Sequence, residues 1–212
     1  MNGTQDRGAL IVLEGCDCSG KSTQCRRIVE KLRSSKIQAE LVSFPDRTTP
    51  IGSLINDYLK KDVHVADQVI HLLFAANRWE RAEELKSLVN KGVTVVVDRY
   101  SYSGVAYSAA KKVGCASLQW FKNPEEGLPK PDAVFYLHLE PAVVALRKGF
   151  GEERYEVPKF QLDVAECYNQ LNDGTWKIIN ADKTVDDLTS ELYSHVTQVV
   201  DQCRMRPLDV LW

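Results

Sequence analysis

The stretch "ALIVLEGCDCSGKST", residues 9–23, joins a short apolar run to a glycine-containing loop and the start of a helical pattern. Within it, Gly15, Gly20, Lys21 and Ser22 fit G-x-x-x-x-G-K-[ST], the pattern of a phosphate-binding loop that follows a strand and opens a helix. The glycines let consecutive backbone N–H groups turn toward one anion, and the helix adds its positive N-terminus. The Lys21 side chain can reach the β- and γ-phosphates of a nucleotide, and the Ser22 hydroxyl can bind Mg²⁺. We therefore expect this loop to bind a nucleotide.

The two cysteines of this loop offer a competing interpretation, a metal or redox site. The six cysteines of the chain form one C-x-C pair, Cys16 and Cys18, and four isolated thiols, with no second ligand pair at zinc-like spacing. We therefore expect Cys16 to be a small packed residue. A thiol at a helix N-terminus tends toward a lowered pKa, which leaves redox regulation at Cys18 open as an alternative.

Four more apolar runs with little alternation follow along the chain, as a parallel sheet covered by helices on both faces requires. They lie at residues 39–44, 93–98, 133–139 and 176–181. Amphipathic stretches of helical period separate them, at residues 22–35, 67–92 and 184–204. The second of these ends at Gly92, a residue typical of a helix C-cap. The alternation predicts a three-layer α/β fold with a five-stranded parallel sheet, in a single domain spanning residues 1–212.

Composition excludes several classes of protein. The chain has 27 basic and 29 acidic residues, and a net charge of -2 offers no broad field for nucleic acid or an anionic membrane. No apolar run reaches the ~20 residues that span a bilayer, and the N-terminal residues lack the pattern of a signal peptide. Cysteines without an export signal indicate free thiols in a reducing compartment. We expect a cytoplasmic protein, with the nucleus as the other candidate.

The motifs of the chain follow the predicted strands, where open α/β sheets bind their ligands. The phosphate loop follows the first strand, "FPDR" (44–47) the second and "DRYSYSG" (98–104) the third, and the polar segment 147–161 lies beyond the fourth. Asp98 closes the third apolar run, a position where a carboxylate can hold magnesium through water. We expect these segments to meet at one edge of the sheet.

Arginines at this edge favour a kinase over a nucleotide switch. The chain lacks the N-K-x-D segment with which a guanine-nucleotide switch reads its base. It carries arginines outside the phosphate loop at positions 47, 78, 99, 147 and 154. Guanidinium groups suit a second phosphate and the charge of a transferring phosphoryl group.

Residues 8–212 resemble the eukaryotic type of the thymidylate kinase family. The resemblance rests on "RGALIVLEG", "GKSTQ", "FPDRTTPIG", "HLLFAANRWE", "VVVDRYSYSGVAY", "GLPKPD" and "ERYE". It implies the phosphate-loop nucleoside monophosphate kinase fold, with a lid at about residues 147–161. It also implies phosphorylation of dTMP to dTDP by direct in-line transfer from ATP, with Mg²⁺ as the cofactor, in a homodimer.

The phosphate loop and the resemblance together imply a set of site residues. The expected catalytic residues are Asp17, Lys21, Arg99 and Arg147. The expected ATP-binding residues are Gly15, Cys16, Asp17, Cys18, Ser19, Gly20, Lys21, Ser22, Thr23, Arg147 and Lys183, the last near the adenine. The expected dTMP-binding residues are Asp17, Phe44, Arg47, Phe74, Arg78, Arg99, Ser103, Gly104, Tyr107, Tyr155 and Gln161, and the expected metal ligands are Ser22 and Asp98.

Several of these roles have a physical reason. Phe74 would stack on thymine while Arg78, four residues along the same helix, binds its polar edge. Arg47 and Arg99 would hold the dTMP phosphate, with Asp17 and Phe44 beside the sugar. Tyr107 near the deoxyribose would crowd a 2'-hydroxyl.

The chain departs from the family pattern at Cys18, where eukaryotic-type relatives usually carry a basic residue. We expect the basic residues of the lid, Arg147 foremost with Lys148 and Arg154, to compensate in part. A deoxynucleoside kinase stays open as the alternative enzyme, and a weakly catalytic nucleotide-binding module as the alternative outside that class.

Overall fold

The computed structural model of the chain describes residues 6–113, 116–144 and 151–212. Its centre is a sheet of five strands in the order β2-β3-β1-β4-β5, with every neighbouring pair parallel. The strands are β1 (Leu10–Glu14), β2 (Ala39–Ser43), β3 (Thr94–Asp98), β4 (Ala133–His138) and β5 (Lys177–Asn180). The predicted strands and the α/β fold class are confirmed. Because β1 and β3 are buried at every position, their sequences run apolar without alternation.

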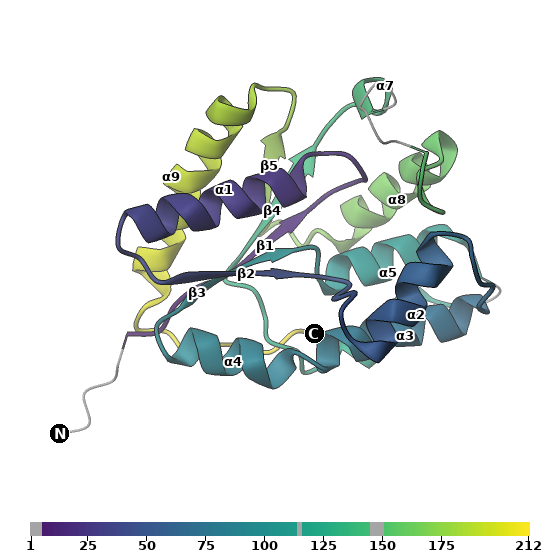
Figure 1. Cartoon of the computed structure of the whole chain (residues 1–212), viewed down its shortest axis with the longest axis horizontal. Coiled ribbons are helices and arrows are strands. Elements are labelled where there is room, and N and C mark those ends of the chain that lie inside the picture. The colour runs from purple at the N-terminus through teal and green to yellow at the C-terminus, as the bar shows by residue number, and fades with distance from the viewer. Residues whose placement is uncertain (1–5, 114–115, 145–150) are drawn as a thin grey trace.

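Helices cover both faces of this sheet (Figure 1). On one face, α1 (Lys21–Ser34) and α9 (Val185–Cys203) pack against the sheet through Ile28 and Leu192. On the other face lie α4 (Ala82–Asn90), α5 (Ser101–Ala110) and α8 (Pro158–Leu171). The two hydrophobic cores are therefore separated by the sheet, which gives the three layers expected from the sequence.

The amphipathic stretch 67–92 forms two helices rather than one. The first, α3 (Asp67–Trp79), packs against α2 (Pro50–Leu59) beyond the sheet edge, whereas α4 packs under β3. The chain turns between them at Arg81, whose side chain pairs with Asp46 and with Glu84. Helical periodicity alone does not reveal the break, because both halves keep an apolar stripe. The predicted cap is confirmed: Gly92 has φ +86° and its N–H donates to Val89 O at 3.0 Å.

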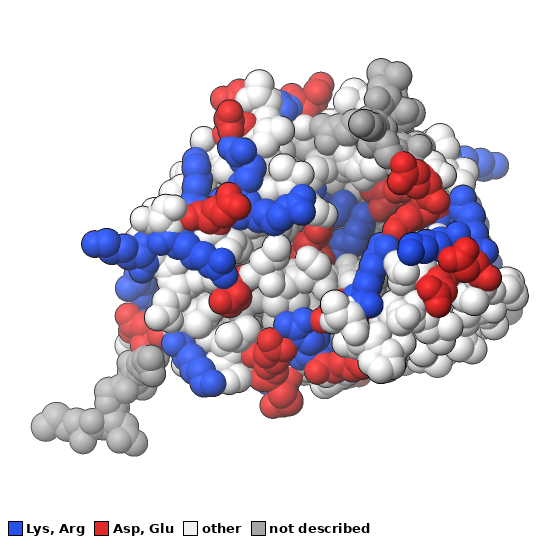
Figure 2. Space-filling model, viewed as in Figure 1, with Lys and Arg blue, Asp and Glu red and all other residues white. Residues whose placement is uncertain are grey.

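The remaining described helices are short. They are α6 (Leu118–Lys122), the 3₁₀ turn η1 (Asn123–Glu125) and α7 (Pro141–Val144). In the described ranges, no helix combines the length and apolarity needed to cross a membrane. Figure 2 shows basic and acidic side chains interspersed over the face in view, which agrees with the nearly balanced composition.

Candidate active site

Segments that are distant in the sequence meet at the carboxyl edge of the sheet. Leu13 near the end of β1 and Ser43 at the end of β2 each pair with Asp98, the last residue of β3. The phosphate loop, the "FPDR" segment and the "DRY" segment therefore leave the sheet side by side. The common edge expected from the sequence is present for these three segments.

The phosphate loop depends on its glycines. Gly15 has φ +143° and Gly20 has φ +96°, conformations that side chains disfavour. A Cβ on Gly15 would also lie 2.6 Å from the carbonyl oxygen of Leu137 on β4. The sheet therefore leaves no room for a side chain at the first position of the motif.

Lys21 begins α1 and bends back across this loop. Its ammonium donates to Cys16 O at 2.6 Å and to Ser19 Oγ at 3.1 Å. Burial lowers the pKa of Lys21 to about 8, and the nearby charge of Arg99 acts in the same direction. Thr23 is exposed on the first turn of α1.

Ser22 and Asp98 could hold a metal ion. Both line one cavity at the sheet edge, and Oδ1 of Asp98 is buried without a hydrogen-bond partner among the described residues. Magnesium prefers oxygen ligands and commonly completes its shell with water and substrate phosphates. No group of three or more His, Cys, Asp or Glu in the described ranges could enclose an ion. The residues present therefore fit Mg²⁺ that arrives with a nucleotide.

The loop cysteines do not have the environment of reactive thiols. Cys16 packs beside Tyr136, with its Sγ 3.8 Å from the phenolic oxygen, and burial raises the pKa of the thiol. Burial also raises the pKa of the Cys18 thiol, helped by the charges of Glu156 and Asp17. This direction does not favour the alternative of redox regulation at Cys18, because burial and the two carboxylates outweigh the effect of the helix N-terminus on the thiol pKa.

Asp17 connects the phosphate loop to the "DRY" segment and to the lid. One carboxylate oxygen accepts from Arg99 and the other from Gln161 Nε2 at 2.7 Å. Gln161 also accepts the backbone N–H of Asp17 at 2.8 Å and donates to Tyr155 O at 2.9 Å. Arg99, with φ +65°, further donates to Gly15 O at 3.1 Å. These contacts hold Asp17 and Arg99 together as a fixed ion pair.

The cavity at this edge has a volume of about 520 Å³. It brings together every residue expected to bind dTMP except Gln161, which reaches it through Asp17. These lining residues are Asp17, Phe44, Arg47, Phe74, Arg78, Arg99, Ser103, Gly104, Tyr107 and Tyr155. The polar and aromatic groups come from the loops after β1 to β3, from α3 and α5, and from the lid.

Arg47 joins the loop after β2 to the lid. Its guanidinium donates to Asn56 Oδ1 at 2.8 Å and to Glu153 Oε1 at 2.7 Å. Both ionic partners are partly exposed, so the pair is accessible to an anion that enters the cavity.

At the other part of the cavity, Arg78 pairs with a residue that we did not anticipate. The Arg78 guanidinium donates to both carboxylate oxygens of Glu125, from Nε at 2.8 Å and from Nη2. Phe74 lies one helical turn earlier and lines the same cavity. Glu125 carried no sequence signal, because it is one of two adjacent acidic residues in an irregular segment.

Glu14 is a second residue that sequence analysis missed. Its carboxylate is fully buried and accepts the backbone N–H groups of Tyr100 at 2.9 Å and Ser103 at 3.1 Å. It also accepts the hydroxyl groups of Ser103 and Tyr168. Burial raises the pKa of Glu14. Glu14 thus holds the start of α5, the helix that carries Ser103, Gly104 and Tyr107, in the way an acidic cap does.

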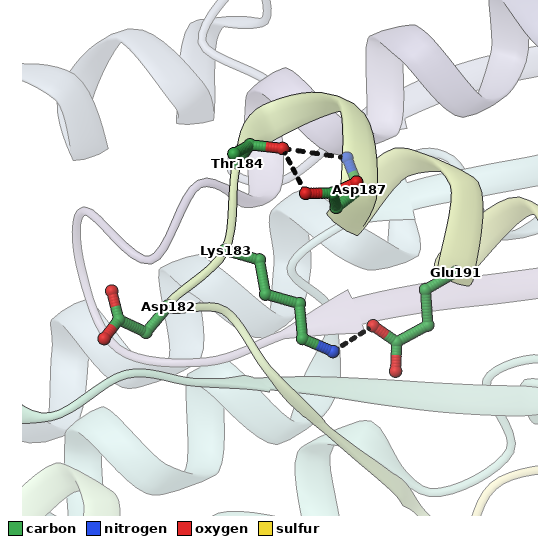
Figure 3. A pocket seen from close by; sticks show the side chains of 5 residues that line it. All are labelled: Asp182, Lys183, Thr184, Asp187 and Glu191. Atoms are coloured by element: carbon green, nitrogen blue, oxygen red, sulfur yellow. Dashed lines mark hydrogen bonds and ion pairs between the residues drawn. The ribbon is translucent and has the colours of Figure 1, made fainter.

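Lys183 lies in a different, shallow hollow where the chain passes from β5 to α9 (Figure 3). Its ammonium donates to Glu191 Oε2 at 2.6 Å, while Thr184 caps the helix by accepting the N–H of Asp187 at 3.1 Å. This hollow adjoins α1, since Gln24 donates to Val185 O at 3.1 Å.

The structure describes only part of the expected lid. Arg147 and Lys148 lie outside the described residues. Arg154 donates to Tyr58 O at 2.7 Å and to Val63 O at 3.0 Å, with its guanidinium 4.1 Å from the centre of the Tyr58 ring. Arg154 therefore ties the lid to α2 and the segment after it, a contact that we did not expect of a residue meant to compensate for Cys18.

Comparison with known proteins gives a consistent family. The model of the family described as thymidylate kinase matches residues 13–192. The thymidylate kinase of Homo sapiens is 46% identical over 209 residues, covering 97% of this chain and 98% of that protein. The thymidylate kinase of Schizosaccharomyces pombe is 47% identical over 201 residues, covering 92% and 94%. The solved structure of thymidylate kinase from Candida albicans superimposes with a TM-score of 0.88 at 37% identity, covering 99% of this chain and 100% of that one.

Proposed function

Because the chain belongs to the thymidylate kinase family, we propose that residues 1–212 act as one catalytic domain and that the cavity at the sheet edge is its dTMP site. The chain phosphorylates dTMP to dTDP with ATP as the donor. The observation that supports the site assignment is the lining of the cavity. It combines Arg99, which contacts the phosphate loop, and Arg47 with an aromatic ring and a buried arginine, Phe74 and Arg78.

On the donor side, the phosphate loop binds ATP. Lys21 exchanges its contacts with Cys16 O and Ser19 Oγ for phosphate oxygens, and the loop amides surround the same phosphates. Ser22 and Asp98 would hold Mg²⁺, which neutralises charge on the phosphates when it is bound. The lid covers the nucleotide and excludes water, with Arg147 supporting transfer and Lys183 near the adenine.

On the acceptor side, Arg47 and Arg99 hold the dTMP phosphate. An oxygen of that phosphate attacks the γ-phosphorus of ATP in line, and ADP leaves. Arg99 is fixed by Asp17 and Gly15, so its guanidinium is positioned to bridge acceptor and donor phosphates. Arg47 uses two of its five N–H donors on Asn56 and Glu153, so three donors remain for the phosphate, which competes with Glu153 for the charge of the guanidinium.

At the base, the ring of Phe74 stacks on thymine and the guanidinium of Arg78 binds its edge. Ser103, Gly104, Tyr107, Tyr155 and Gln161 surround the nucleoside, with Asp17 and Phe44 beside the sugar. Tyr107 lies on α5 with its ring 5.2 Å from the Arg99 guanidinium, close to the phosphate end of the site. A ring there would crowd a 2'-hydroxyl and so favour deoxynucleotides.

The two alternatives are not favoured. A deoxynucleoside kinase needs a free base near a 5'-hydroxyl, whereas the carboxylate of Asp17 in this cavity is bound by Arg99 and Gln161, and Arg47 and Arg99 suit a phosphate. A weakly catalytic module would bind ATP and dTMP without producing dTDP. Coupled ADP release by the purified protein separates the three. We expect ADP release that depends on dTMP and Mg²⁺ and is absent when thymidine replaces dTMP. ADP release with thymidine, or binding of ATP and dTMP without ADP release, would contradict the proposal.

We further propose a homodimer, with the cytosol as the compartment and the nucleus as the other candidate. In support of a dimer, α3 exposes Val69, Leu72 and Trp79, whose side chains are 49%, 46% and 41% accessible. Exposed apolar side chains at helical spacing are typical of an interface. The compartment rests on the cysteine usage of the sequence.

A further inference from the structure

The ion pair between Arg78 and Glu125 is buried more completely than a surface salt bridge. The two side chains are 2% and 0% exposed, and two N–H groups of the guanidinium each meet one carboxylate oxygen. Among the described residues, Glu125 is the only acceptor bound by Arg78 through a hydrogen bond of its guanidinium. A planar guanidinium has five N–H donors, so this fork leaves donors on Nη1 and one on Nη2 for a ligand.

Gly104 of α5 restricts the same guanidinium from another side. A Cβ at Gly104 would lie 2.2 Å from Nη2 and 2.9 Å from Cζ of Arg78, so the guanidinium rests directly against the backbone of α5. Arg78, Gly104 and Phe74 line one cavity. The direction of the free donors is therefore set by Glu125 and by the helix backbone rather than by solvent.

The backbone on both sides of Glu125 is held by contacts that lie away from the active edge. Trp79 Nε1 donates to Pro124 O at 2.7 Å, which fixes the η1 turn to α3. The following residues pair with the C-terminal residues of the chain: Gly127 N donates to Leu211 O at 3.0 Å and Leu211 N to Leu128 O at 2.7 Å. Such anchoring lets a carboxylate impose an orientation on its partner.

The chemistry of the bases makes this orientation matter. Thymine presents the O4 acceptor where cytosine presents the N4 amino donor. A guanidinium can only donate, so a fixed Arg78 pairs with thymine and leaves the cytosine amino group facing other donors without a partner. If the Arg78 guanidinium could turn away, the site would lose both the hydrogen bond to thymine and the discrimination against cytosine.

We propose that Glu125 is a positioning residue that orients Arg78 and thereby sets the preference for thymine over cytosine. Glu125 acts through Arg78 and does not touch the substrate. The inference rests on the proposed role of Arg78 at the base.

The first test compares Glu125→Gln with Glu126→Gln, an exposed neighbour of the same charge. Steady-state kinetics are measured with dTMP, dCMP and ATP as the varied substrates. For Glu125→Gln we expect the KM for dTMP to rise about tenfold and the ratio of kcat/KM for dTMP over dCMP to fall about tenfold. The KM for ATP stays within about twofold, because the phosphate loop is untouched. Glu126→Gln keeps all three values.

A second variant guards against loss of folding in Glu125→Gln. Glu125→Asp keeps the buried negative charge but is too short to meet both nitrogens, so we expect the same selective rise in the KM for dTMP at a Tm near that of the parent chain. If a folded Glu125→Asp or Glu125→Gln keeps the parental KM for dTMP and the parental base preference, the inference is wrong. A proportional loss with all three substrates, together with a lowered Tm, would assign Glu125 a purely structural role and would also overturn it.

Arg78→Met separates this inference from the proposed function. If Arg78→Met leaves the KM for dTMP and the base preference unchanged, the proposed role of Arg78 fails. If Arg78→Met alters both while the Glu125 variants alter neither, only the inference on Glu125 fails. Because Glu125 is to act through Arg78, the double variant Arg78→Met/Glu125→Gln should show the base preference of Arg78→Met alone; additive losses would contradict the positioning role.

Discussion

At the scale of single residues, Cys18 takes the backbone conformation of the phosphate loop but brings no positive charge to it. Its φ of +55° shows that the loop holds a left-handed backbone at this position even though the residue is not glycine. The thiol packs against the core between α1 and α9 and has a raised pKa, so it supplies neither a charge nor a thiolate. Position 18 therefore contributes its backbone to the loop, and a basic side chain there would be an addition to the chemistry.

We predict that Cys18→Arg speeds phosphoryl transfer measured in a single turnover. The gain should be about tenfold, below the ~10³ that a sole transition-state arginine contributes, because we propose that Arg147 supplies part of the charge. Arg147→Ala should slow the same step. Cys18→Met, of similar length and without charge, serves as the control. No gain from Cys18→Arg together with no loss from Arg147→Ala would contradict the compensation.

His71 is a buried residue whose protonation state matters for stability. Its ring lies against Trp120 and Phe121, and Nδ1 lies 2.9 Å from Ser108 Oγ. Burial, and then the charge of Arg78, lowers the pKa of His71 to about 4. The folded chain therefore keeps this imidazole neutral over a pH range in which an unfolded chain protonates it.

We predict that the free energy of unfolding falls as the pH drops below about 6.5, in part through His71. Since the unfolded state binds the proton between the ordinary pKa of 6.5 and about 4, stability rises with pH across this window. From pH 7 to pH 4.5 the parent chain should lose about 2 kcal/mol more than His71→Asn does. Urea denaturation at both pH values measures the difference. His64→Gln, at an exposed position, should lose as much as the parent; equal losses in His71→Asn and the parent would refute the role of His71.

At the scale of elements, the described part of the lid is attached at both ends. Arg154 binds the carbonyls of Tyr58 and Val63, and Gln161 at the start of α8 binds Asp17 of the phosphate loop. The lid is thus connected to α2 on one side and to the nucleotide loop on the other. Between these two attachments, the rings of Tyr155 and Phe160 pack against the core and against Tyr107, so apolar contacts hold the same segment.

We predict that Arg154→Gln loosens the lid without unfolding the chain. The variant loses the charged fork to two carbonyls, so amide hydrogen exchange in residues 151–157 should accelerate about tenfold. Exchange in β1 and β3 should stay as in the parent. Lys159→Gln, an exposed change in the same region, should leave exchange in residues 151–157 unaltered. Unchanged protection in Arg154→Gln would show that other contacts hold this segment.

At the scale of the whole molecule, the proposed dimer depends on α3. This helix carries Phe74 and Arg78 toward the cavity and exposes Val69 and Leu72 to solvent. An interface on the exposed face would bury these side chains directly behind the base site. Assembly and base recognition would then share one helix.

We predict that the double variant Val69→Lys/Leu72→Lys sediments as a monomer at concentrations where the parent chain is a dimer. Burying two ammonium groups without partners costs several kcal/mol, more than a moderate interface can offset. Ile178→Lys, at an exposed apolar position on the edge strand β5, should remain dimeric. If the double variant keeps the dimer, the interface lies elsewhere.

Features that depend on residues close together in the chain could be predicted from the sequence, whereas features that depend on contacts between distant segments could not. The phosphate loop, the position of each motif directly after a strand and the cap at Gly92 depend on local backbone chemistry and hydrophobic periodicity. Residues near one another in the chain therefore determine them. The dTMP residues were named through family motifs, and the structure gathers all but Gln161 around one cavity. The break between α3 and α4 was missed, because packing against different parts of the molecule decides it.

The sequence by itself determined that this protein has a parallel α/β sheet with a phosphate loop at its carboxyl edge, since each strand, each helix and the loop has a pattern within a short segment and the segments alternate along the chain. Only the tertiary structure decided that Glu125 orients toward Arg78, that Glu14 holds the start of α5, and that Arg154 ties the lid to α2. Each of these pairs joins segments separated by 47 to 96 positions. Charged residues are common in any sequence, and only the folded chain decides which carboxylate, amide or carbonyl each of them meets, because a charge removed from water requires a partner.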